Sequence, residues 1–236
     1  MKTKGIIFDY GGTLDTAGCH WGIMLWQAYQ RHQVPVTEEQ FRQAYVYGER
    51  TLGKNPIIQP NYTFHKTLDV KVRIEFDYLR EQGWWICDNE TRKSFHTTIL
   101  EDLYQQVIAT TAASRQVLQM LKTQLPLVLV SNFYGNLPVV LNEFQLSDLF
   151  QGVIESAVVG VRKPDKRIFQ LGVEALGLCP EEVLVVGDSL DKDILPAQQL
   201  GCRTAWLKGQ GWTDSPMTSI QPDYTIHTIK DVGKTL

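Results

Sequence analysis

The sequence predicts an α/β fold in which a doubly wound, mainly parallel β-sheet carries a smaller α-helical insert. The first observation is a series of short runs rich in Val, Ile and Leu, each bounded by Gly, Pro, Asn or Asp. Continuous apolar runs of this length are typical of strands that are buried on both faces of a parallel sheet. The second observation is that helical patterns separate these runs, so that strand and helix alternate as they do in doubly wound domains.

The strands and helices of this sheet domain can be placed in order along the chain. The predicted strands are residues 4–9, 126–131, 152–156, 183–187 and 203–207, and the predicted helices between them are residues 113–124, 136–145, 165–177 and 192–201. Parallel strands need a crossover connection between them, and a helix is the usual one. A much longer segment separates the first strand from the second.

That segment, residues 16–109, has a different texture from the rest. It is polar, rich in aromatic residues and patterned for helices at 21–33, 37–52, 69–81 and 90–108, with a break at the prolines of PIIQPNY. No β-branched run in it would extend the sheet. We therefore expect a helical cap domain at 16–109 and a core domain made of residues 1–15 and 110–236. Hinge motion is expected where the chain passes between them, near Gly18 and Thr110-Thr111.

Composition and charge exclude several classes of function. The chain has 236 residues, of which 43% are hydrophobic, so it can bury a full core. Its net charge of −3 gives no general attraction to nucleic acid or to an anionic membrane. The longest apolar runs, such as 125–130, are far shorter than the roughly 20 residues that span a bilayer. We expect a protein that binds neither nucleic acid nor membrane and acts as a monomer or homodimer.

The N-terminus and the cysteines indicate a cytoplasmic protein. Residues 1–4 lead straight into the first strand, which leaves no room for the apolar stretch of a signal peptide. The four cysteines are scattered, without a C-x-x-C pair or a metal-ligand spacing, and free thiols are expected: Cys19, Cys87, Cys179 and Cys202.

Polar residues gather where the predicted strands end. Asp9 follows the first strand, Ser131 and Asn132 follow the second, and Asp188 follows the fourth. Lys163 lies just before a predicted helix. Because ligands of open α/β sheets bind at the carboxyl ends of the strands, these side chains are expected to form one site.

With these residues and the short sequences around them, the chain resembles the haloacid dehalogenase-like (HAD) superfamily. All four motifs of that family can be read in order, as FDYGGTLD at 8–15, LVSN at 129–132, VRKP at 161–164 and VVGDSLDKD at 185–193. The resemblance covers residues 1–15 and about 110–207. It implies a Rossmann-like core, and the position of the insert, directly after the first motif, is that of the helical cap which many of these enzymes carry.

The resemblance implies hydrolysis of a small phosphorylated metabolite through an aspartyl-phosphate. Asp9 would attack phosphorus, and Mg²⁺ would lie between Asp9 and Asp188, with the backbone carbonyl of Gly11 as a further ligand. Asp193 would support the metal. The Ser131 hydroxyl, the neighbouring backbone around Asn132 and the Lys163 ammonium would hold the phosphoryl oxygens, with Lys163 serving in catalysis as well.

Gly11 departs from the family's pattern. In its phosphatases the residue two after the nucleophile is a second aspartate, the general acid and base, and a group of this kind contributes about 10²–10⁴-fold to the rate. Three interpretations remain open. The enzyme could be a weak or atypical phosphatase, with an acid supplied from elsewhere, for which Asp15 is a poor substitute and His20 a candidate. It could carry out phosphonate hydrolase-type chemistry through a Schiff base on the cap residue Lys54. It could also be a non-catalytic relative that binds metal and phosphate.

Overall fold

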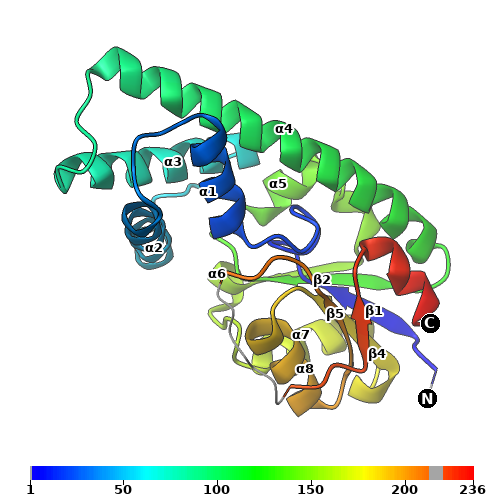
Figure 1. The fold of residues 1–236 in the computed structure, drawn as a ribbon. Helices are drawn as coiled ribbons and strands as arrows, with labels where there is room; N and C mark the ends of the chain where they lie inside the picture. The colour runs from blue at the N-terminus through cyan, green and yellow to red at the C-terminus, as the bar shows by residue number, and fades with distance from the viewer. Residues whose placement is uncertain (1, 213–219) are drawn as a thin grey trace.

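The computed structural model, which describes residues 2–212 and 220–236, is built on a six-stranded parallel sheet in the order β3-β2-β1-β4-β5-β6 (Figure 1). The strands are β1 (Gly5–Phe8), β2 (Leu127–Ser131), β3 (Gly152–Glu155), β4 (Val183–Gly187), β5 (Arg203–Leu207) and β6 (Tyr224–Ile226). All five pairings between neighbours are parallel. The predicted fold class is therefore confirmed, and β6 is an edge strand that the sequence did not predict.

Helices cover both faces of the sheet, which makes it doubly wound. They are α4 (Asn89–Lys122), α5 (Leu137–Glu143), α6 (Ser156–Val159), α7 (Arg167–Leu176) and α8 (Leu195–Leu200). Turns of 3₁₀- or π-helix lie at Ser147–Leu149, Pro180–Glu182, Leu190–Ile194 and Ile229–Lys234. Figure 1 shows α4 and α5 on one side of the strands and α7 and α8 on the other. Alternate residues of β1 serve the two faces: Ile6 and Phe8 pack in the core beneath α4, whereas Ile7 packs with Phe169 of α7.

The segment between β1 and β2 folds into helices α1 (Trp21–Arg31), α2 (Glu38–Lys54) and α3 (Phe64–Glu81), followed by α4. Aromatic rings hold them together: the Tyr29 ring centroid lies 4.8 Å from that of Phe41 and 5.6 Å from that of Phe76. The helix predicted at 69–81 begins earlier, because Thr63 caps α3 by accepting a hydrogen bond from Lys66 N. The predicted helices of this segment are thus present.

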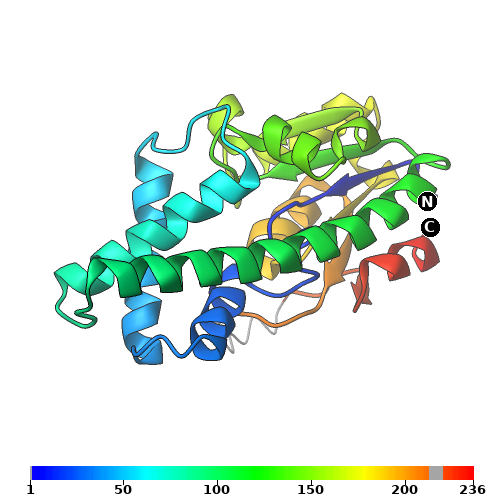
Figure 2. The same ribbon diagram turned by 90° about the horizontal axis from the view of Figure 1, so that it is seen from above.

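One helix, α4, replaces the two helices predicted at 90–108 and 113–124. It runs for 34 residues, and Figures 1 and 2 show it passing from the helical insert to the sheet. No Gly or Pro interrupts its sequence, and the Thr111 hydroxyl donates to Val107 O at 2.7 Å, within the helix itself. The interruption between these two predicted helices is therefore absent, whereas the hinge motion expected near Thr110-Thr111 stays a prediction. At the other crossing Gly18 has a left-handed φ of 88°.

The order of the strands places the candidate site. The chain steps from β1 to β2 and β3 on one side and to β4 and β5 on the other, so the topological switch lies at β1. Such switch points open a crevice at the carboxyl ends of the strands. Within residues 2–212 and 220–236, moreover, no helix combines the length and the apolar character that crossing a membrane requires.

Candidate active site

Three central strands deliver the candidate residues to one edge of the sheet. Asp9 directly follows β1, Ser131 ends β2 and Asp188 directly follows β4. The register sets Phe8 beside both Leu129 and Val186, so these strands end at nearly the same level. The buried residues before Asp9 and Asp188 hold β1 and β4 in the sheet, and the two strands in turn place both carboxylates at the same edge.

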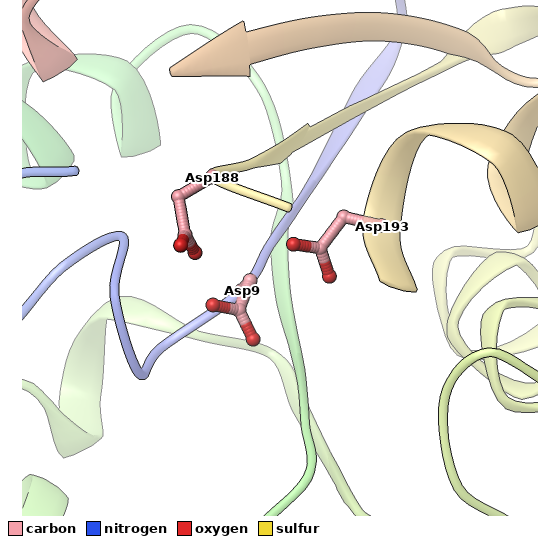
Figure 3. A group of neighbouring side chains, drawn as sticks. All are labelled: Asp9, Asp188 and Asp193. Atoms are coloured by element: carbon pink, nitrogen blue, oxygen red, sulfur yellow. The ribbon is translucent and has the colours of Figure 1, made fainter. Parts of the chain in front are cut away.

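The carboxylates of Asp9, Asp188 and Asp193 converge on one point (Figure 3). One oxygen from each lies within 4.8 Å of the others. Asp193 comes from the turn that precedes α8, and its Oδ2 accepts a hydrogen bond from Ser189 N at 3.1 Å. Both Asp9 and Asp193 are buried. Three carboxylates held this close repel one another unless cations lie between them.

The Lys163 ammonium supplies one of those cations. Its Nζ lies 2.6 Å from Asp9 Oδ1 and 2.7 Å from Asp193 Oδ1, and the side chain is buried. Burial disfavours the charged ammonium, but the carboxylates of Asp193 and Asp9 outweigh it and raise the pKa of Lys163. The lysine therefore stays protonated and holds the two aspartates in place.

The remaining charge of the cluster is negative. Burial raises the pKa of Asp9 to about 6, with Lys163 lowering it and Asp193 raising it. Burial, followed by the charges of Asp9 and Asp193, raises the pKa of Asp188 as well. One ammonium facing three carboxylates leaves a deficit of positive charge, and hard oxygen donors are the ligands that Mg²⁺ prefers. The donor set therefore fits a divalent cation of that kind.

Thr13 belongs to this site although it was not among the predicted residues. Its Oγ1 lies 3.1 Å from Asp9 Oδ2 and 3.0 Å from Asp188 Oδ1, and the side chain is fully buried. The single hydroxyl proton can be donated to either oxygen, so Thr13 orients both carboxylates. Its place in FDYGGTLD was the signal that could have identified it.

The two glycines after Asp9 differ sharply. Gly11 is exposed, and no atom lies within 4 Å of where a Cβ would be. Gly12 has a φ of 98°, and a Cβ there would lie 2.5 Å from the Asp188 carboxylate oxygens. Glycine is therefore required at Gly12, both for the left-handed backbone and for the close approach of Asp188. Nothing in the local geometry requires it at Gly11.

The two predicted phosphate-binding residues after β2 have different surroundings. Ser131 is buried at the end of the strand. The Asn132 side chain is engaged with the backbone of Lys163: its Nδ2 donates to Lys163 O at 3.1 Å, and its Oδ1 accepts from Lys163 N at 2.9 Å. The structure thus gives the Asn132 amide a positioning contact, which ties the second motif to the third.

Lys54, considered for a Schiff base, and Asp15 and His20, considered as substitutes for a missing acid, lie in three different settings. Lys54 is exposed at the end of α2. Asp15 is buried, and its two oxygens accept from Gly12 N and Trp21 Nε1 at 2.7 and 3.0 Å. Burial raises the pKa of Asp15 to about 7. His20 caps α1 through Nδ1, and burial, with Lys192 and Lys71 adding to it, lowers its pKa to about 4.

Curated relatives match parts of this chain. It is 41% identical over 64 residues to glyceraldehyde 3-phosphate phosphatase from Pyrococcus furiosus, which covers 27% of each chain. It is 34% identical over 87 residues to phosphoserine phosphatase from Thermus thermophilus, covering 37% of this chain and 34% of the relative. Phosphoglycolate phosphatase from Caulobacter vibrioides is 32% identical over 125 residues, half of each chain. The chain thus matches between about a quarter and a half of the length of these relatives.

Solved structures extend the likeness over the full length. YfnB from Bacillus subtilis, described as a HAD-hydrolase bound to magnesium, superimposes with a TM-score of 0.63 at 20% identity, covering 100% of this chain and 99% of YfnB. L-2-haloacid dehalogenase from Xanthobacter autotrophicus does so with a TM-score of 0.60 at 19% identity, covering 98% and 97%. At sequence identities of 19–20%, this similarity shows a common fold.

The family itself follows from the sequence match. The model of the haloacid dehalogenase-like hydrolases matches residues 3–201, which contain all four motifs and the whole acidic cluster. The fold, the cluster at the switch point of the sheet and the phosphatase relatives agree with this match. The chain belongs to the haloacid dehalogenase-like hydrolases.

Proposed function

We propose that this hydrolase is a magnesium-dependent phosphatase of small phosphate monoesters, in which Asp9 is the nucleophile. The observation that carries the proposal is the buried cluster in which Lys163 joins Asp9 to Asp193 beside Asp188. Relatives named as phosphatases for small phosphorylated metabolites support the substrate class. A metal-bound neighbour, YfnB, supports the choice of magnesium.

The metal would be held by Asp9, the Gly11 carbonyl and Asp188, with Asp193 supporting it from the other side. When bound, Mg²⁺ supplies positive charge that offsets the charge of the carboxylates and of the phosphoryl oxygens. The two oxygens of Asp193 accept hydrogen bonds from Lys163 Nζ and Ser189 N, and these contacts would hold it in that supporting position.

The side chains of this protein would do the rest of the chemistry. The Asp9 carboxylate forms a bond to phosphorus while the bond from phosphorus to the ester oxygen breaks, which gives an aspartyl-phosphate and an alkoxide that takes its proton from water. Lys163, Ser131 and the backbone after Asn132 hold the phosphoryl oxygens as the phosphate transfers. Water then cleaves the aspartyl-phosphate and restores Asp9.

The leaving oxygen needs a proton, and Gly11 cannot supply one. Substrates whose leaving group is already a weak base, such as acyl phosphates, are therefore favoured over simple alkyl esters. Both oxygens of Asp15 accept hydrogen bonds, from Gly12 N and Trp21 Nε1, so Asp15 is not placed to protonate the leaving oxygen. We propose accordingly that turnover of alkyl esters is slow.

We propose that residues 16–109 act as a cap domain above this site, with residues 1–15 and 110–236 as the core domain. Closure of a cap excludes water during reaction. We further propose a cytoplasmic protein, acting as a monomer or homodimer without nucleic acid or membrane partners. The four cysteines, which are free in the structure, agree with a reducing compartment.

The test compares phosphate release with and without Mg²⁺ for alkyl phosphates, aryl phosphates and acetyl phosphate. Wild type should release phosphate only with the metal, and Asp9→Asn should lose this activity and the covalent adduct formed with beryllofluoride. Asp148→Asn, an exposed change of the same kind, should behave as wild type. Turnover by Asp9→Asn at the wild-type rate would refute the nucleophile.

Two alternative functions give different results in this assay. Tight binding of phosphate with no turnover of any ester would indicate a non-catalytic relative. Borohydride trapping of phosphonoacetaldehyde on Lys54 would indicate phosphonate hydrolase-type chemistry. A Schiff-base lysine needs a lowered pKa, from burial or a neighbouring cation, and Lys54 is exposed.

A further inference from the structure

An ion pair between a buried lysine and a partly exposed glutamate joins two helices of the insert, and its lysine was not among the predicted residues. Lys71 of α3 is 7% exposed, and its Nζ lies 2.6 Å from Glu49 Oε1 of α2. The ammonium also lies over two aromatic faces, 4.9 Å from the Tyr45 ring centroid and 5.5 Å from that of Trp21. The Lys71 ammonium is thus held by one carboxylate and by the faces of two aromatic rings.

Two series of contacts connect this ion pair with the loops that follow β1 and β2. Trp21, under the Lys71 ammonium, donates its indole N–H to Asp15, which in turn accepts from Gly12 N in the first motif. From the other side, the Tyr134 hydroxyl donates to Glu49 Oε1 at 3.4 Å. Tyr134 lies two residues beyond Asn132 of the second motif. The pair is therefore on the side of the insert that meets the loops after β1 and β2.

The third motif and the turn after β4 also approach this region. Lys192, in that turn, and Lys71 both lower the pKa of His20, after the larger effect of burial. Arg162, next to Lys163, lies close enough to Tyr134 to affect its pKa. The Lys71–Glu49 pair thus lies near the loops that carry Asp9, Lys163 and Asp188.

Glu49 is a replaceable partner for Lys71. Its side chain is 37% exposed, so it can turn into water when another anion arrives. The other nearby carboxyl, Glu75, stays in place: it is fully buried, its Oε2 accepts from the Tyr29 hydroxyl at 3.0 Å and its Oε1 has no hydrogen-bond partner. Displacement of Glu49 would therefore leave a desolvated ammonium that strongly favours an incoming carboxylate.

We propose that Lys71 binds a carboxylate on the leaving group of the substrate, which displaces Glu49. The proposal deepens the proposed function and rests on it: the substrate is then a small phosphorylated metabolite whose leaving group carries a carboxylate. Its phosphate end lies at Asp9 and Lys163, and its carboxylate end lies at Lys71. A carboxylate is the group that Lys71 already holds, in the form of Glu49.

The test measures binding, so that it does not depend on turnover. With Mg²⁺ present, calorimetry compares 3-phosphonopropanoate with propylphosphonate, which lacks the carboxylate. Wild type should bind the first about 10–100-fold more tightly, the range of hydrogen bonds between charged groups. Lys71→Met should lose this preference while retaining its affinity for propylphosphonate. Lys66→Met, an exposed lysine of the same helix, should keep the preference.

A second variant keeps the test decisive if Lys71→Met fails to fold. Glu49→Gln removes the competing charge, so it should tighten the binding of 3-phosphonopropanoate and leave propylphosphonate unchanged. Equal binding of the two ligands by wild type, or equal losses in Lys71→Met, would overturn the proposal and leave Lys71 a structural residue. A carboxylate preference without any ester hydrolysis would support the subsite and refute the phosphatase. Failure of both ligands to bind would refute both.

Discussion

The Asp188 carboxylate fills the space in which a side chain of residue 12 would lie. A Cβ on Gly12 would come within 2.5 Å of both Asp188 oxygens, and the backbone there has a φ of 98°. The loop after β1 and the end of β4 are thus in direct contact through the absence of a side chain. The geometry of the acidic cluster depends on this contact.

Gly12→Ala should therefore weaken magnesium binding as well as stability. The left-handed backbone costs about 1–3 kcal/mol for a residue with a Cβ, and the overlap displaces Asp188 from the cluster. Calorimetry with Mg²⁺ and thermal unfolding measure the two effects. Gly83→Ala is the control, since Gly83 also has a positive φ but has open space around its Cβ position. It should lose stability alone; equal magnesium affinity in Gly12→Ala would contradict the role assigned to the contact.

Gly11→Asp, at the neighbouring position, should leave the stability of the protein nearly unchanged, unlike Gly12→Ala. The site has room for the side chain and no left-handed backbone, so thermal stability should stay within about 0.5 kcal/mol of wild type, as for other exposed positions. A carboxyl group there should raise the hydrolysis of alkyl phosphates toward the low end of the roughly 10²–10⁴-fold range of general acids. Neighbours that would aim it are lacking. Gly11→Asn, equal in size but without an acid, should show no gain. The same rate in both variants would mean that Gly11 belongs to a different chemistry.

Asp188→Ala should lower the affinity for Mg²⁺ by at least tenfold. The change removes a carboxylate from the cluster and leaves Thr13 to donate to Asp9 alone. Asp191→Ala provides the control: Asp191 is exposed in the same turn and lies outside the cluster. Calorimetric titration of both variants decides the matter. Unchanged affinity in Asp188→Ala would place the metal elsewhere.

Glu75→Gln should change how stability depends on pH. Burial raises the pKa of Glu75 to about 7 from its ordinary 4.5, while Lys71 and the Tyr29 hydroxyl lower it and Glu49 raises it. The folded state therefore holds the proton more tightly, and the free energy of unfolding of wild type falls as pH rises from about 4.5 to about 7. Glutamine cannot ionise, so this loss should disappear.

The expected size of that effect is large enough to measure. The difference between the folded and unfolded pKa of Glu75 should lower the free energy of unfolding of wild type by at most about 3 kcal/mol between pH 5 and pH 8. Urea unfolding should therefore show that the free energy of unfolding of Glu75→Gln, relative to that of wild type, is higher at pH 8 than at pH 5. Glu81→Gln, an exposed change in the same helix, should follow wild type. Parallel pH profiles for Glu75→Gln and wild type would show that Glu75 remains ionised in the folded protein.

The sheet and the cluster were predictable because their signals are local in the sequence. The runs that became β1, β2 and β4 are apolar along their whole length, and such runs have few alternatives to a buried strand. The positions of Asp9, Ser131 and Asp188 at the ends of those strands then placed them together, since the carboxyl ends of parallel strands share one edge.

What could not be predicted depends on contacts between distant residues. Strand β6 has three residues, too few for a pattern, and it forms by pairing with β5. Helix α4 runs unbroken through residues 109–112, where the predicted pattern had an interruption although neither Gly nor Pro occurs there. Nothing in the local sequence distinguishes Lys71 from the exposed Lys66 of the same helix, because burial arises from the packing of α2 against α3.

The place of β1 at the centre of the sheet has a consequence for synthesis of the chain. Ile6 pairs with Leu127 on one side and with Leu184 on the other, so β1 is made long before either neighbour. At about 5–20 residues per second, the wait for β2 alone is roughly 6–24 s. During that time the apolar strand GIIF has no sheet to join. A nascent chain that stops before β4 leaves it open to association with other chains, so interrupted translation should yield aggregating fragments rather than a smaller folded protein.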